Sequence, residues 1–286
     1  MPRSPFGLQR PLQSNSRRSF SATGISLPSV AVLVVGFGAA IMGLAADSTS
    51  TAAADVENRG NVAPHVATFS ILGHDPETGM IGGAVQSRVF SVGNGVLWGE
   101  ADVGMVATQA IVDVSYGPQA LALMRDGKAP GEIVEILLQN DPDPGYMGYD
   151  WPKAGRQFSV MDASGVVATH TGPEADAWAG HLIGENCSAQ GNILAGPAVV
   201  RSMVDAFENT KGHLSARLMA ALEAGQAAGG DTRGMQSAAM LIVQKDGGVW
   251  LNNDVVLRLQ VDDSSSPIVE LRRLVDKAHE RFGWND

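Results

Sequence analysis

Short apolar runs bounded by turn residues dominate the pattern of hydrophobic and polar positions between residues 68 and 261. Runs of this length, flanked by Gly, Asp, Pro and Ser, are typical of β-strands. They predict strands over residues 68–73, 80–87, 92–99, 103–110, 157–162, 166–170, 178–183, 188–192, 237–244 and 255–261. The first two flank Asp75-Pro76-Glu77-Thr78-Gly79, a turn sequence that predicts a β-hairpin.

Apolar residues at three- and four-residue spacing predict helices between these strands. The first covers 116–125 and ends at Asp126-Gly127, and the second begins at Pro130, where a first helical turn tolerates proline. A later helical pair has the apolar positions Val200, Met203, Val204 and Phe207, then Leu214, Leu218, Ala221 and Leu222. The last helix carries Ile268, Leu271, Leu274, Val275 and Phe282.

The order of these elements predicts the fold class. Runs of strands followed by pairs of helices do not fit a parallel sheet in which strands and helices alternate singly. We therefore expect an α+β fold of two packed antiparallel sheets with helix layers outside, a four-layer αββα sandwich. Residues 68–286 are expected to form it as a single domain.

Composition and charge exclude several classes of protein. The chain is 44% hydrophobic and 17% charged, which is globular rather than disordered. Its 20 basic and 30 acidic residues give a net charge of −10, which argues against a nucleic-acid partner. The single cysteine, Cys187, excludes an internal disulfide framework and a thiolate zinc site. No paired-His zinc motif, P-loop or serine elbow is present, so no metal or organic cofactor is expected.

The first 54 residues differ from the remainder. They hold four arginines and one acid, which leaves a net charge of −13 for residues 55–286. An arginine-bearing head, with a twin-arginine-like Arg17-Arg18, precedes an apolar run over residues 30–46 and small residues that suit cleavage after Ala45 or Ala54. This order predicts export, to the periplasm in a bacterium, with residues 55–67 as a linker or pro-segment. The alternative is an uncleaved membrane anchor, since the apolar run reaches the lower limit for a span of about 17–25 residues.

Several blocks of the remaining sequence carry a family resemblance. They are Ala67-Thr68-Phe69-Ser70-Ile71-Leu72, Gly83-Ala84-Val85-Gln86-Ser87, Ala107-Thr108-Gln109-Ala110, His170-Thr171-Gly172, Ser188-Ala189-Gln190-Gly191-Asn192-Ile193-Leu194-Ala195-Gly196 and Gly229-Gly230-Asp231-Thr232-Arg233-Gly234-Met235-Gln236-Ser237-Ala238. Together they resemble the bacterial and archaeal domain-of-unknown-function family 1028, over residues 68–244. That family is grouped with the N-terminal-nucleophile (Ntn) hydrolases, so the resemblance also implies the αββα sandwich.

The superfamily resemblance implies a chemistry for Thr68. The opening hairpin looks like that of a proteasome β-subunit, in which the first strand begins with the catalytic threonine. A threonine hydroxyl needs a base, and an N-terminal α-amine with a pKa near about 7.7–8.0 can accept its proton. Thr68 is internal as encoded, so a cut after Ala67, by the chain itself or by another protease, is required. The resemblance departs at Gln86, where the proteasome turn has an acid, and in lacking a lysine near the second hairpin.

Further candidate residues each have an ordinary structural alternative. Ser87 is expected to orient the nucleophile, or else to cap a turn. Asn192 and Gln190 are candidate amide donors to an oxyanion, although Asn192 also suits a helix cap.

Three more residues are candidates for binding substrate. Arg233 suits the binding of a substrate carboxylate, with Gln236 beside it, and the alternative is an Asp231–Arg233 pair that fixes a loop. His170 is a candidate acid or base, or else a hydrogen-bonded core residue.

Two function hypotheses of different class follow. The first is an exported Ntn-type hydrolase that cleaves an amide in a small-molecule or cell-wall-related substrate through Thr68. The second is a non-catalytic exported binding protein with the same fold, and a subunit of a larger assembly is a third possibility. Small-molecule substrates are the expected partners, homo-oligomers are compatible, and the membrane is involved only through an uncleaved signal.

Overall fold

The computed structural model describes residues 67–284. The predicted export signal, and the segment that follows it up to residue 66, lie outside the described residues. The described part is a mixed α+β structure with two antiparallel sheets and five α-helices, which confirms the predicted class.

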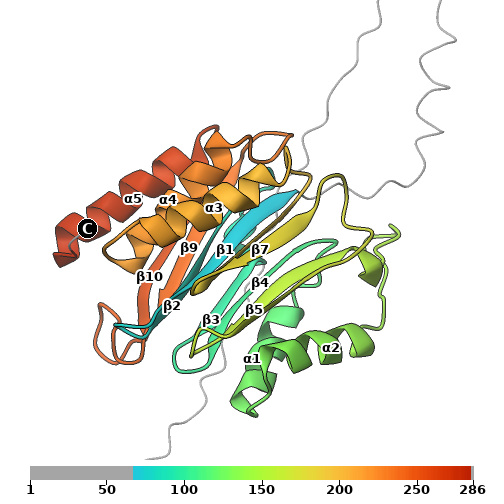
Figure 1. Cartoon of the computed structure of the whole chain (residues 1–286), viewed down its shortest axis with the longest axis horizontal. Helices are drawn as coiled ribbons and strands as arrows, with labels where there is room; N and C mark the ends of the chain where they lie inside the picture. Colours follow the sequence, from blue (N-terminus) through green and yellow to red (C-terminus); the bar gives the residue numbers. More distant parts are fainter. Residues whose placement is uncertain (1–66, 285–286) are drawn as a thin grey trace, which may run out of the picture. The chain divides into compact units, whose positions relative to one another are not determined.

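The larger sheet has six strands in the order β10-β9-β2-β1-β8-β7 (Figure 1). Their bounds are β1 Thr68–Asp75, β2 Met80–Ser87, β7 Gly180–Gly184, β8 Cys187–Asn192, β9 Ser237–Val243 and β10 Val255–Val261. The smaller sheet has four strands in the order β3-β4-β5-β6, with bounds β3 Leu97–Glu100, β4 Gly104–Ala110, β5 Arg156–Asp162 and β6 Val167–Thr171. Because β1 lies inside the larger sheet, both of its edges are hydrogen-bonded, to β2 and to β8.

The helices cover the outer faces of the two sheets, as Figure 1 shows. They are α1 Tyr116–Arg125, α2 Pro130–Asn140, α3 Ala198–Asn209, α4 Leu214–Ala227 and α5 Pro267–Phe282. α3, α4 and α5 pack on the larger sheet, and α1 and α2 pack on the smaller one. Gly117 permits the close approach of α1 to β3, because a Cβ there would lie 2.2 Å from the ring of Trp98.

Strand alternation separates the apolar contacts of the larger sheet into two layers. On β1, Phe69 and Ile71 pack against the helices, whereas Leu72 packs between the sheets. Ser70 also faces the smaller sheet, because its hydroxyl donates to Oε1 of Gln109 on β4 over 2.6 Å. By the same alternation, the side chain of Thr68 faces the space between the sheets.

One predicted strand differs from the structure. Residues 92–99, predicted as a strand, form a 3₁₀-helix over Val92–Asn94 before the shorter strand β3. Ser91 has a left-handed backbone (φ 57°), and the N–H of Val92 donates to Oγ of Ser237 instead of to a strand partner. The other predicted strands agree with the structure within two residues at each end. The helix predicted over 116–125 has the same bounds in the structure, and the next helix begins at Pro130 as predicted.

A buried ion pair joins the end of α2 to the start of β5. Arg156 donates from Nε to Oδ2 of Asp141 over 2.9 Å, and Tyr116 donates its hydroxyl to the same oxygen over 2.6 Å. The side chains of Arg156 and Asp141 are 1% and 0% exposed. Burial alone would raise the pKa of Asp141, but the bonds from Tyr116 and Arg156 outweigh it and hold that pKa below its usual value.

Candidate functional site

Thr68 is the first residue of β1 and stands opposite the last residues of the two neighbouring strands. It pairs with Ser87 of β2 on one side and with Asn192 of β8 on the other. All three side chains are buried, and Thr68 is 0% exposed. The strand order therefore brings together three residues that lie far apart in the sequence.

Each polar group of Thr68 has a partner from a different strand. Its backbone N–H donates to Oδ1 of Asn192 over 3.1 Å, and its hydroxyl donates to Oγ of Ser87 over 3.1 Å. Its carbonyl oxygen accepts from Nε2 of Gln109 over 3.0 Å. The position and orientation of the hydroxyl are thus set by β2, β4 and β8 together.

The peptide carbonyl ahead of Thr68 is bound by side chains rather than by a strand partner. The hydroxyl of Ser87 donates to the carbonyl oxygen of Ala67, and Nη2 of Arg233 donates to the same oxygen over 3.0 Å. Ser87 thus accepts from the Thr68 hydroxyl and donates to the carbonyl oxygen beside it. The bond that must break to make Thr68 N-terminal lies inside this cluster.

Arg233 is fixed by a two-pronged ion pair with Asp231. Its Nε and Nη2 donate to Oδ1 and Oδ2 of Asp231 over 3.2 and 2.9 Å. Asp231 also accepts the backbone N–H of Arg233 over 2.9 Å and that of Arg88 over 3.3 Å. The loop-fixing alternative is therefore present, and this edge of the guanidinium is not open to a substrate carboxylate.

Gln190 lies deeper between the sheets than Asn192. Its Nε2 donates to the carbonyl oxygen of Ala107 over 3.1 Å and lies 3.3 Å from Oγ of Ser70. Gln109 and Gln157 extend the same buried layer, since Gln109 Nε2 donates to Gln157 Oε1 over 2.9 Å. The layer joins the two sheets below the Thr68 cluster, and Gln190 does not contact Thr68 in any hydrogen bond of the described part.

The side chains of Gln236 and His170 have partners outside the cluster. The backbone N–H of Gln236 donates to the carbonyl oxygen of Ser87 over 3.0 Å, but its side chain donates from Nε2 to Oδ1 of Asp263 over 3.1 Å. The ring of His170 packs against Phe158, with centroids 5.6 Å apart, on the face of the smaller sheet that α1 and α2 cover. His170 is half-buried, and its burial, with a smaller effect of His181, lowers the pKa of its ring.

Gln86, which stands where the resembled hairpin has an acid, also faces away from Thr68. It pairs with Phe69 and Ala238, both of which pack against the helices. Its buried Nε2 lies 3.5 Å from the carbonyl oxygen of Gly234. Gln86 therefore supports the loop that carries Arg233 rather than the Thr68 hydroxyl.

Gln109, which donates to the carbonyl oxygen of Thr68, is a residue of the candidate site that the sequence analysis did not predict. It belongs to a block that carried the family resemblance, yet its contact with Thr68 spans 41 positions of the chain. A buried glutamine on a predicted strand gives no local sign of such a partner. The sequence indicated such a contact only through the polarity of Gln109 at a strand position that alternation predicts to be in the core.

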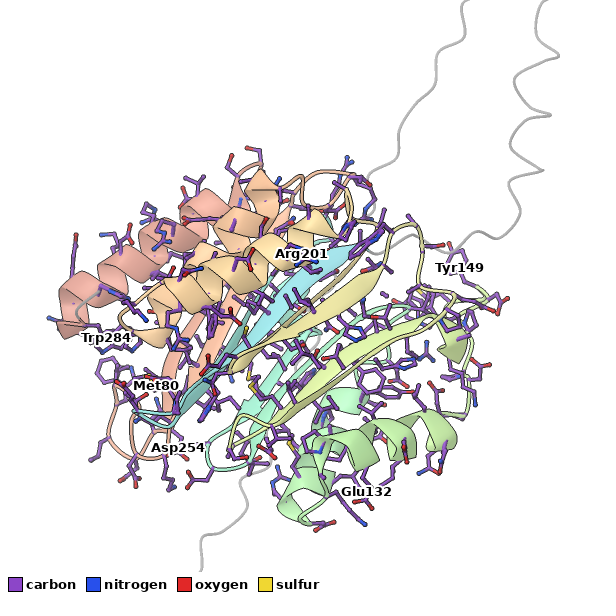
Figure 2. The ribbon with its side chains drawn as sticks, viewed as in Figure 1. Met80, Glu132, Tyr149, Arg201, Asp254 and Trp284 are labelled. Atoms are coloured by element: carbon purple, nitrogen blue, oxygen red, sulfur yellow. The ribbon has the colours of Figure 1, made fainter. Side chains whose placement is uncertain are left out.

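A cavity lies at the other end of the larger sheet, away from Thr68. It encloses about 710 Å³ between the β1–β2 turn, the β7–β8 turn, the α3–α4 loop and the last described residues. Met80 and Trp284, both labelled in Figure 2, contribute to its wall. β1 begins at Thr68 and runs toward this cavity, so the cavity belongs to a different end of the molecule.

The described residues contain neither a metal-binding cluster nor a helix that could span a membrane. Among residues 67–284, no group of three or more His, Cys, Asp or Glu side chains is arranged to hold a metal ion. Within the same residues, every helix is too short or too polar to cross a membrane.

The fold and the Thr68 cluster thus define an α+β protein whose candidate site lies at the start of a central strand. Residues 68–271 match the family of unknown function DUF1028, and the chain belongs to that family. The crystal structure of protein SPO2555 from Silicibacter pomeroyi, of the same family, is similar to the chain, with 34% identity and a TM-score of 0.65. The match covers 74% of this chain and 89% of that one. A search of curated proteins found no match.

Proposed function

We propose that the protein is an exported Ntn-type hydrolase that cleaves an amide bond through Thr68 once this residue is N-terminal. The observation that carries the proposal is the environment of Thr68, which begins a central strand with its hydroxyl, nitrogen and preceding carbonyl all hydrogen-bonded to side chains. Helices on the outer faces of two stacked antiparallel sheets support assignment of the fold to the αββα sandwich of Ntn hydrolases.

The nucleophile and its base would come from one residue. With Thr68 N-terminal, its α-amine replaces the amide N–H that Asn192 now accepts. A neutral amine can take the proton of the threonine hydroxyl as Oγ attacks an amide carbon. The departing amine then receives that proton, and water releases the acid from the ester in a second attack.

The buried state of Thr68 supports a role for the residues ahead of it as a pro-segment. Thr68 and Ala67 are both 0% exposed, so substrate has no access to the hydroxyl while Ala67 is in place. Removal of Ala67 and the preceding chain creates the α-amine and vacates the space that Ala67 fills. A cell-wall-related amide and a small-molecule amide are both substrates of the proposed class.

A non-catalytic binding protein is the second candidate. The internal position of Thr68 favours it, because an intact Ala67–Thr68 bond leaves the Ntn mechanism without its base. In that case the hydrogen bonds around Thr68 only fix the beginning of β1.

One experiment separates the two candidates. The N-terminus of the protein recovered from its native compartment is determined by intact mass and N-terminal sequencing, and the protein is then assayed on a panel of amides beside a Thr68→Ala variant. We expect a chain that begins at Thr68, turnover that Thr68→Ala abolishes, and partial turnover in Thr68→Ser. A chain that still carries Ala67, with no turnover, would leave the binding protein as the better explanation.

A further inference from the structure

The carbonyl oxygen of Ala67 accepts hydrogen bonds from two side chains that belong to separate parts of the fold, Ser87 of β2 and Arg233 of the loop before β9. We propose that Arg233 and Ser87 form the site for the acyl oxygen of the bond that Thr68 attacks, and that Asp231 is the positioning residue for Arg233. This inference rests on the proposed function and assigns catalytic roles within it.

The geometry of Arg233 exceeds what fixing a loop requires. Asp231 already holds Nε and one hydrogen of Nη2, yet Nη2 also lies 3.0 Å from the Ala67 oxygen. The side chain of Asp231 is 0% exposed, whereas that of Arg233 is 23% exposed. The buried carboxylate of Asp231 therefore fixes the guanidinium of Arg233 so that its Nη2 donates to the carbonyl oxygen of Ala67.

A charged donor at this point favours the transition state over the ground state. When Oγ of Thr68 bonds to the carbonyl carbon, the electron pair of the C=O double bond moves onto the oxygen. Hydrogen bonds from a guanidinium to an anionic oxygen are stronger than those to a neutral carbonyl. With a substrate amide, the proton of the Thr68 hydroxyl passes to the α-amine and then to the departing amine, which takes the electrons of the broken C–N bond. In the intact chain, where Thr68 has no α-amine, that proton passes to the Thr68 nitrogen as the bond from this nitrogen to the Ala67 carbonyl carbon breaks. The product is an ester on Oγ, which water or hydroxylamine cleaves.

Asn192 accepts the N–H of Thr68 through its amide oxygen, and Gln190 donates from its amide nitrogen to the carbonyl oxygen of Ala107 in the buried layer. Ser87, by contrast, touches both the nucleophile and the acyl oxygen, so it aligns one with the other. Ser87 and Arg233 are the donors that the structure brings to the Ala67 oxygen.

The chain's own residue indicates the class of substrate. In the intact chain the acyl residue at this site is alanine, and it is 0% exposed. A substrate amide that presents its carbonyl to the same two donors places its acyl residue where Ala67 lies. The class is therefore an amide whose acyl half ends in a small, alanine-like residue.

The first test follows the Ala67–Thr68 bond in the full chain, made in a translation system of purified components without proteases. Intact mass is recorded over time for the natural chain, Arg233→Ala, Arg233→Lys and the control Arg272→Ala, with and without neutral hydroxylamine. Arg272 is a matched control because it forms a similar two-pronged pair, with Glu223, away from Thr68. We expect cleavage in the natural chain and the control, and a rate lower by about 10²-fold or more in Arg233→Ala.

Added guanidinium at tens of millimolar separates a chemical role from a structural one. If Arg233 binds the acyl oxygen, guanidinium or Arg233→Lys restores part of the rate. Loss of rate that neither restores means that Arg233 only supports its loop, and overturns the proposal. A natural chain that stays intact even in hydroxylamine overturns it as well.

The second test uses the boronic acid analogue of N-acetylalanine on chains that begin at Thr68, because its tetrahedral adduct with Oγ places an oxygen at the proposed site. We expect Arg233→Ala and Ser87→Ala to bind it at least about tenfold more weakly than the natural chain, and Arg272→Ala to bind it equally well. Equal affinity in Arg233→Ala overturns the acyl-oxygen site. A site that passes both tests in a protein with no amide turnover means that the proposed function fails while the acyl-oxygen site stands.

Discussion

The backbone nitrogen of Thr68 donates a hydrogen bond to Oδ1 of Asn192 over 3.1 Å, from the first residue of β1 to the last residue of β8. When that nitrogen is an α-amine, the amide oxygen still accepts one of its hydrogens. The amine is then held on the strand that carries the hydroxyl it must deprotonate. In the proposed mechanism, Asn192 therefore sets the orientation of the α-amine and its pKa.

Replacement of Asn192 by aspartate puts a negative charge beside the α-amine. A neighbouring carboxylate stabilises the ammonium form, so the pKa of the amine should rise by about 1–3. Because only the neutral amine accepts the proton, the acidic limb of the pH profile of kcat/KM should move to higher pH by the same amount. Asn186→Asp, in the β7–β8 turn at the other end of β8, is the control and should leave the profile unchanged. An unshifted limb in Asn192→Asp would mean that the α-amine is not the base.

Loss of the Ser87 hydroxyl should reduce turnover without unfolding the protein. Ser87→Ala removes both the acceptor of the Thr68 hydroxyl and a donor to the acyl oxygen, and we expect kcat to fall by about 10²–10³-fold. Ser188→Ala is the matched control, because Ser188 is equally buried and its hydroxyl lies 2.7 Å from that of Thr169, away from Thr68. Steady-state kinetics decide the outcome, and similar losses in both variants would point to a general effect on the sheet.

The stability of the protein should depend on the polar groups of the buried glutamine layer, which an apolar side chain of similar size does not replace. Gln109→Met leaves the carbonyl oxygen of Thr68, the hydroxyl of Ser70 and Oε1 of Gln157 without their bonds to Gln109. Unsatisfied buried groups cost about 1–3 kcal/mol each, so we expect the free energy of unfolding to fall by at least about 2 kcal/mol. Gln119→Met, at an exposed position of α1, should change it by less than about 0.5 kcal/mol in the same urea titration.

The ion pair between Asp141 and Arg156 should show a defined pH dependence. Asp141→Asn leaves a buried guanidinium without its counter-charge, and we expect a loss of about 3–5 kcal/mol at neutral pH. Because the pKa of Asp141 is held below its usual value near about 3.9, its charge stabilises the folded state fully above that pH and progressively less as the pH falls below it. Thermal unfolding at a series of pH values should show the two proteins converging below about pH 4. A gap that stays constant there would contradict the assignment.

The reactivity of Cys187 reports whether β8 is closed to solvent in the native protein. Burial, with a smaller contribution from Glu208, raises the pKa of its thiol to about 12. At about pH 8 the native chain should react with iodoacetamide at least about 10³-fold more slowly than the unfolded chain, because the thiolate is the reactive form. Mass spectrometry of timed samples measures both rates, and fast labelling of the native protein would show that β8 is not closed.

Local patterns predicted the elements better than their contacts. The hairpin around Asp75-Pro76-Glu77-Thr78-Gly79 was predictable because its turn residues and alternation act within a short span. The strand predicted at 92–99 is present only from Leu97, where it pairs with β4. Its first part was wrong because a distant hydroxyl, that of Ser237, accepts the N–H of Val92.

The residues of the candidate site also differ in how far their positions could be predicted from local sequence. Thr68 and Ser87 follow from hairpin register, and Asn192 joins them through its pairing with Thr68. The placement of Gln190 in a buried layer, and of His170 under α1 and α2, depends on which face of a strand is turned to which sheet. The partner of Arg233 was within reach of sequence reasoning, since Asp231 is two positions away, but its contact with Ala67 spans 166 positions.

The free end of a chain is ordinarily the part that moves most. Here the residue that cleavage would leave at the end is hydrogen-bonded across both edges of its strand, so the new terminus stays inside the sheet rather than fraying from it. The folded sheet would then hold Thr68 in place before any substrate binds. A chain end of this kind exists only as long as the sheet around it is intact, which ties the lifetime of the proposed activity to that of the folded domain.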